Sequence, residues 1–169
     1  AWFLHGRADA WFFWPDAEDH LRGQRDALGV ELEALPLTTP DGLAQAHPDA
    51  TGSLAIFVHG LCESEESWAL AADRHHGEVG VTYGSLLQRD LGITPLFVRF
   101  NTGLCITENA QALADLVEQV VAAWPVPVEE IVLVGHSMGG LVVRSACHLG
   151  AEGGQAWPAV VRHVFCLGS

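Results

Sequence analysis

The sequence has few basic residues, no long apolar runs and none of the spacings that mark common metal or nucleotide sites. Eight Lys and Arg stand against 21 Asp and Glu, giving a formal net charge of −13. Such a surface repels phosphate backbones and disfavours nucleic acid as a partner. No run approaches the ~18 apolar residues of a membrane span. CxxC, P-loop and G-x-G-x-x-G patterns are all missing, so neither a metal nor a cofactor is expected.

The four cysteines, Cys62, Cys105, Cys147 and Cys166, are best read as free thiols in or near a core. The alternative is a Cys62–Cys105 bridge between two loops, which only an oxidising compartment would maintain. The chain starts at Ala1 without a signal-peptide pattern, which slightly favours a cytoplasmic location and leaves the true N-terminus open.

From Glu31 onward, short apolar runs alternate with helical periodicity, the pattern of βαβ units around a mostly parallel sheet. The expected strands are Leu54–Val58, Thr94–Phe100, Ile131–Val134 and Val164–Leu167. The expected helices are Tyr83–Leu91, a segment with an apolar face over 113–124, and Met138–Leu149. The right-handed crossover rule makes the four strands parallel, with helices on both faces, so the fold class is α/β.

Residues 1–50 are expected to form an aromatic-rich, helical extension ahead of a domain over 51–169. Trp11-Phe12-Phe13-Trp14 precede Pro15, and a helix is predicted over Ala17–Leu28. Packing of these aromatics against the domain is favoured. A lid or a patch that touches a membrane surface is the alternative.

Gly135-His136-Ser137-Met138-Gly139 fits the G-x-S-x-G nucleophile elbow. The motif directly follows a predicted strand and precedes a predicted helix, which is the setting that the elbow requires. A serine on so tight a turn needs neighbours without Cβ atoms, and its hydroxyl then lies at the positive end of the helix. The alternative is a glycine-rich turn of a nucleotide-binding protein, but the companion motifs of such proteins are missing.

A second motif, His59-Gly60-Leu61-Cys62, ends the predicted strand Leu54–Val58. In hydrolases with this elbow, one oxyanion-hole N–H comes from the residue after the serine, here Met138. The other comes from the loop after the fold's third strand, here Leu61. We expect His59 to structure this loop rather than to act as a base.

These two motifs, together with Arg99-Phe100-Asn101-Thr102-Gly103, resemble bacterial α/β-hydrolases of the lipase/esterase type. The branch indicated is that of PGAP-like lipases related to GPI inositol-deacylase, over about residues 50–169. The resemblance implies that Ser137 attacks the carbonyl of a small-molecule or lipid ester and that water hydrolyses the acyl-enzyme. Further residues are expected to shape the site: His59, Gly60, Cys62, Asn101, Gly135, His136 and Gly139.

The catalytic acid and base are not evident. The family order is Ser, then Asp or Glu, then His, but after Ser137 the sequence has no Asp, one Glu (Glu152) and two His (His148, His163). The predicted helix that starts at Met138 runs away from the site edge, and its far end lies roughly 18 Å from that edge at ~1.5 Å per residue. His148 and Glu152 lie at this far end and His163 begins the next strand there, so none of the three is expected to take part. We therefore expect an incomplete α/β-hydrolase whose acid and base lie past Ser169.

Upstream, Asp73, His75 and His76 are assigned to a loop after the first strand, most simply a solvated one. A metal or substrate contact and a catalytic base are the alternatives. Three functions stay open: ester hydrolysis, which is favoured, acyl transfer on the same nucleophile, and a non-catalytic member of the fold that binds a ligand or partner.

Overall fold

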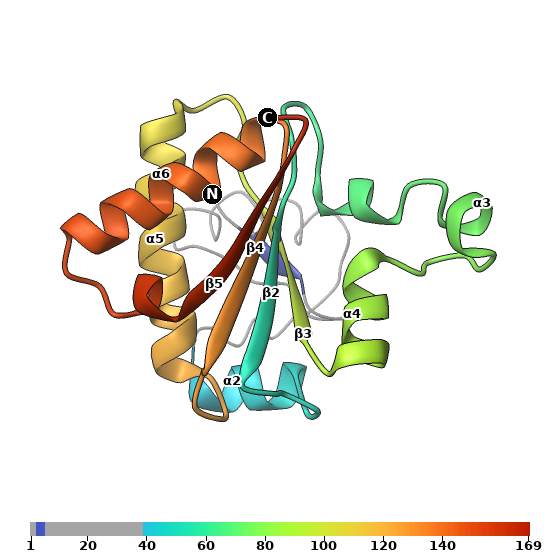
Figure 1. Cartoon of the computed structure of the whole chain (residues 1–169), viewed down its shortest axis with the longest axis horizontal. Coiled ribbons are helices and arrows are strands. Elements are labelled where there is room, and N and C mark those ends of the chain that lie inside the picture. Colours follow the sequence, from blue (N-terminus) through green and yellow to red (C-terminus); the bar gives the residue numbers. More distant parts are fainter. Residues whose placement is uncertain (1–2, 6–38) are drawn as a thin grey trace, which may run out of the picture.

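The computed structural model describes residues 3–5 and 39–169, so the aromatic cluster Trp11–Trp14 and the helix predicted over Ala17–Leu28 lie outside the described residues. The described chain forms a five-stranded sheet in the order β1-β3-β2-β4-β5 (Figure 1). The strands are β1 (Phe3–His5), β2 (Ser53–Val58), β3 (Thr94–Arg99), β4 (Glu130–His136) and β5 (Val161–Leu167). The predicted parallel arrangement of β2 to β5 is confirmed, and β1 adds an antiparallel strand beside β3.

Strand β5 is longer than the sequence pattern indicates. It begins at Val161 rather than Val164, and His163 pairs with Val132 of β4. Arg162 and His163 interrupt the apolar run and hide the start of the strand. Backbone pairing does not need apolar side chains, so the ladder continues through them.

The three long helices agree with the prediction: α4 (Tyr83–Leu91), α5 (Ile106–Ala123) and α6 (Met138–Glu152). Thr82 and Ser85 form a capping box at the start of α4, and Gly92 ends it in the left-handed conformation. The sequence pattern did not indicate four short helices: α2 (Pro40–Ala46), η1 (Glu65–Ala69), α3 (Ala72–His76) and η2 (Trp157–Val160).

The helices cover the sheet on two sides, as predicted. Figure 1 shows α5 and α6 together on one side and α4 on the other. Alternate residues of β2 supply both cores, because successive side chains of a strand point to opposite faces. Leu54, Ile56 and Val58 pack with α5 and α6, whereas Ala55 and Phe57 pack with Trp68 of η1 and Leu87 of α4. This double burial explains the continuous apolar run of the strand.

Strand β5 is the least covered part of the sheet. Within the described residues it pairs only with β4, and Val164, Phe165 and Leu167 are 40%, 50% and 45% exposed.

None of the described helices has the length and apolar character needed to cross a membrane.

Candidate active site

The elbow serine occupies a strained turn between β4 and α6. Ser137 has φ 49° and ψ −121°, a conformation that residues with a Cβ rarely adopt. Its N–H donates to the carbonyl of Leu167 at the end of β5 (2.8 Å), and its carbonyl accepts from the Gly140 N–H (3.0 Å). The serine is therefore held by β5 as well as by the two elements that it joins, at the positive end of α6.

Both glycines of the motif are required by close backbone contacts. A Cβ on Gly135 would lie 2.5 Å from the Gly140 nitrogen. A Cβ on Gly139 would lie 2.2 Å from the Val58 carbonyl oxygen and 2.5 Å from that of His59. Without a Cβ on Gly135 the chain can turn back on itself, and without a Cβ on Gly139 the first turn of α6 can pack directly on the end of β2.

The turn after β2 lies against the elbow. A Cβ on Gly60 would be 3.1 Å from the Ser137 Cβ and 3.0 Å from the His136 Nδ1. The two predicted motifs, separated by about 75 residues in the sequence, thus meet because β2 and β4 are adjacent parallel strands that end at the same edge. Figure 1 shows this edge at the top, next to the C-terminus.

The backbone amides predicted to form an oxyanion hole belong to Leu61 and Met138. Met138 begins α6, where N–H groups have no partner within the helix. Neither amide donates a hydrogen bond to any of the described residues. Leu61 follows Gly60 in the turn beside Ser137, and the residue is 58% exposed. The two donors lie on the two chain segments that meet at the serine, and their role stays a prediction.

His59 is fully buried and both of its ring nitrogens are occupied. Nε2 accepts the Phe100 N–H (3.3 Å), so Nδ1 carries the proton and donates to the Gly60 carbonyl (2.9 Å). The ring stacks on Phe100 with centroids 4.5 Å apart. Burial lowers the pKa of His59, which keeps the ring neutral at pH 7. His59 thereby joins the turn after β2 to the end of β3.

Glu63 was not among the predicted site residues, but it lies between the turn after β2 and the end of β4. Its Oε2 accepts the Gly60 N–H (2.8 Å) and contacts the His136 Nδ1 (3.0 Å). Burial would raise the pKa of the Glu63 carboxyl, but the Gly60 N–H and the His136 ring outweigh it and lower that pKa. Its position three residues after the turn glycine was the available signal, since a carboxylate at that spacing can accept a turn amide.

A second carboxylate from the same segment reaches the end of β3. Glu65 is buried and forms a two-pronged ion pair with the half-buried Arg99. Trp68 of the same segment packs edge-on against His136, with ring centroids 6.5 Å apart. Residues 63–68 therefore connect the ends of β2, β3 and β4.

Asn101 and Cys62 lie in the exposed loops beside the turn. The Cys62 N–H donates to the Thr102 Oγ1 (3.4 Å), and the Asn101 Oδ1 accepts the Gly103 N–H (2.9 Å). Asn101 therefore stabilises its own loop, and its carbonyl accepts from the buried Asn109 (3.1 Å). All four cysteines are free thiols, and the alternative Cys62–Cys105 bridge is not formed. The expected position in or near a core is wrong for Cys62, Cys105 and Cys166, which are exposed.

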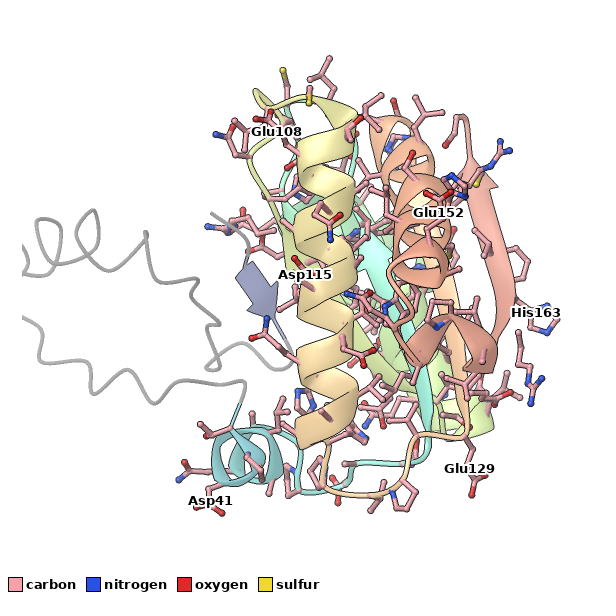
Figure 2. The ribbon with its side chains drawn as sticks, turned by 90° about the vertical axis from the view of Figure 1, so that its left-hand side faces the viewer. Asp41, Glu108, Asp115, Glu129, Glu152 and His163 are labelled. Carbon is pink, nitrogen blue, oxygen red and sulfur yellow. The ribbon has the colours of Figure 1, made fainter. Side chains whose placement is uncertain are left out.

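The histidines of α3, α6 and β5 lie away from the elbow. His75 and His76 belong to the short helix α3 rather than to a loop, and His76 packs against Tyr83. His148 pairs with Glu152 at the far end of α6 (3.4 Å). Figure 2 shows Glu152 on α6, while His163 projects outward from β5 at the edge of the sheet.

No histidine among the described residues forms a hydrogen bond with the Ser137 hydroxyl. The described ranges also contain no group of three or more His, Cys, Asp or Glu side chains that could hold a metal ion. Within the part of the chain that the structure describes, a serine and two backbone amides without a hydrogen-bond partner thus lie at one edge, and no side chain hydrogen-bonds to the serine hydroxyl.

Comparison with known proteins identifies the relatives of this fold. Residues 49–169 match the family described as PGAP1-like alpha/beta domain. The mature form of the Bacillus licheniformis lipase BlEst2 is similar in structure, with a TM-score of 0.51 and 22% identity over 69% of this chain and 40% of the lipase. Its propeptide form gives a TM-score of 0.51 and 21% identity over 70% of this chain and 23% of that one.

A lipase-esterase related protein from Clostridium acetobutylicum is 17% identical, with a TM-score of 0.41 over 70% of this chain and 42% of that one. No curated protein sequence matches the chain. The likeness to the Bacillus lipase shows a shared α/β-hydrolase fold, and the chain spans about 40% of the length of the mature lipase.

Proposed function

The chain belongs to the PGAP1-like alpha/beta domain family, and from this membership we propose that it carries the nucleophile of a serine hydrolase that cleaves carboxylic esters. The observation that supports this most is the conformation of Ser137. A serine with φ 49° between a strand and a helix presents its hydroxyl above the sheet, free of the hydrogen bonds that a regular cap would form.

In the proposed mechanism, Ser137 passes its hydroxyl proton to a base and attacks the ester carbonyl. The C–O bond to the alcohol then breaks, the alcohol leaves with a proton, and water hydrolyses the acyl-enzyme to the free acid and restores Ser137. Negative charge develops on the carbonyl oxygen as the tetrahedral intermediate forms. The Leu61 and Met138 N–H groups would stabilise that charge, because they donate to none of the described residues and lie on the two segments that meet at the serine. The positive end of α6 adds to the same effect.

The acid and the base of the mechanism need a source. The chain spans about 40% of the mature lipase with which it shares a fold, and none of the described histidines contacts the serine hydroxyl. We propose that sequence outside these 169 residues supplies both groups. Lipid esters fit the lipase-like family as substrates. If an acceptor other than water took the acyl group from Ser137, the same nucleophile would catalyse acyl transfer instead of hydrolysis.

The test compares p-nitrophenyl ester hydrolysis by Ser137→Ala with the unmutated protein, in the 169-residue chain and in the full-length gene product. The full-length product should lose at least ~10³-fold in kcat, as when a triad member is removed. The 169-residue chain should hydrolyse the ester no faster than its own Ser137→Ala variant. Ser145→Ala, the same change further along α6, is the control and should retain activity.

Two results would contradict the proposal. Full-length Ser137→Ala activity equal to that of the unmutated enzyme would show that Ser137 is not the nucleophile. Clear Ser137-dependent turnover by the 169-residue chain would show that a base exists within it. In that case His136, whose Nδ1 lies beside the Gly60 turn next to the serine, would be the first to replace.

A further inference from the structure

Glu63 connects three chain segments at the edge where the proposed nucleophile lies. Its carboxylate accepts the Gly60 N–H at 2.8 Å and the Ser67 hydroxyl at 3.4 Å, and it lies 3.0 Å from the His136 Nδ1. Gly60 belongs to the turn after β2, Ser67 to η1, and His136 to the end of β4. The carboxylate side chain is 30% exposed, so solvent screens these contacts only in part.

These contacts fix the turn against the elbow. The space where a Gly60 Cβ would lie is bounded by the Glu63 Oε2, the His136 Nδ1 and the Ser137 Cβ, all within 3.1 Å. The next residue in the turn is Leu61, which carries one of the two proposed oxyanion donors. An amide helps such a reaction only if it already points to the place where charge will develop.

We propose that Glu63 is a positioning residue, whose carboxylate holds the Gly60–Leu61 turn against the elbow and so aligns the Leu61 and Met138 amides. The effect of Glu63 on catalysis rests on the proposed ester hydrolysis, whereas its effect on the position of the turn does not. Glu63 does not touch the reacting atoms. It acts through the Gly60 amide on one side and through the His136 ring, next to Ser137 in the chain, on the other.

The size of the effect follows from the kind of hydrogen bond. A backbone N–H that donates to a carboxylate is favoured over the released state by about 10- to 100-fold in equilibrium. Glu63→Ala should therefore release the turn, while Glu63→Gln, which keeps an acceptor oxygen for the Gly60 amide, should release it less. Glu66→Gln removes a neighbouring charge from an 82% exposed side chain and serves as the matched control.

The primary experiment is amide hydrogen exchange by NMR on the full 169-residue chain. In Glu63→Ala, exchange at the Gly60 amide should be about 10- to 100-fold faster than in the unmutated chain, and the Leu61 and Met138 resonances should move. Glu63→Gln should give a smaller change and Glu66→Gln none. Unchanged Gly60 exchange and unchanged Leu61 and Met138 resonances in Glu63→Ala would overturn the proposal, whatever the activity of the chain.

Kinetics of the full-length gene product separates positioning from substrate binding. Glu63→Ala should lower kcat about 10- to 100-fold with KM nearly unchanged, since misplaced oxyanion donors act on the transition state. A raised KM at constant kcat would overturn the positioning role. If Ser137→Ala leaves turnover intact, the ester hydrolase proposal fails, and the hydrogen exchange still decides the position of the turn.

Discussion

Replacing Gly139 by alanine tests the contact that holds α6 on the end of β2. The new Cβ would lie 2.2 Å from the Val58 carbonyl oxygen and 2.5 Å from that of His59, whereas real Cβ atoms essentially never approach within 3.0 Å. The first turn of α6 must therefore move away from β2 by about 0.8 Å. Both contact atoms are backbone, so no side chain can rotate to relieve the clash.

The expected cost is that of overpacking a well-packed interface, about 1–3 kcal/mol and toward the upper end here. The gain in helix propensity from Gly to Ala offsets at most ~1 kcal/mol of it at this first-turn position. For a domain of this size, a net loss of ~2 kcal/mol lowers Tm by about 4–8 °C. The movement also separates Met138 from the turn after β2, so any Ser137-dependent turnover should fall further than stability does.

Urea unfolding followed by circular dichroism would measure the free energy of unfolding directly. Gly153→Ala, at the other end of α6, is the control, because Gly153 has φ −73° and its nearest Cβ contact would be 3.1 Å. It should change stability by less than ~1 kcal/mol. A Gly139→Ala protein as stable as the unmutated chain would refute the close approach of α6 to β2.

Two further predictions concern ionisable groups. Burial raises the pKa of the Cys147 thiol to about 11, so with a thiol reagent at pH 8 Cys147 should react slowest and the exposed Cys62 much faster; fastest reaction at Cys147 would contradict the burial. The pKa of Glu63 is lower in the folded chain than its ordinary value of 4.5, so the ionised carboxylate stabilises the fold at pH values above 4.5. This stabilisation is lost as the pH falls through the pKa that Glu63 has in the folded chain. The stability difference between the unmutated chain and Glu63→Gln should therefore shrink below about pH 4.5, and a difference constant from pH 6 to pH 3 would rule this out.

The sheet and the long helices follow from local patterns in the sequence. The run Leu54–Val58 is apolar throughout because the strand is buried on both faces, and the limits of α4 coincide with Thr82 and Gly92, residues that cap helices. The short helix α3 was predicted as a loop, since five residues show no periodicity. The extra residues of β5 were hidden because edge strands tolerate polar side chains.

The elbow and the turn after β2 could be predicted because each is a short motif next to a strand. Their contact also followed, since parallel strands end at one edge. Only part of the role of Glu63 could be predicted in the same way. Its spacing from Gly60 indicates an acceptor for the turn amide, but its contact with His136 spans 73 residues, and no local pattern specifies that contact.

At Ser137, the residue that the proposed activity needs is not the residue that would make the fold most stable. With φ 49° and ψ −121°, the position suits glycine better than serine, and the mismatch costs on the order of 1–3 kcal/mol. A library selected only for thermal resistance should accordingly enrich Ser137→Gly, a variant without a nucleophile. Laboratory evolution of this protein would need a catalytic readout at every round, because improvement in folding alone favours loss of the proposed chemistry.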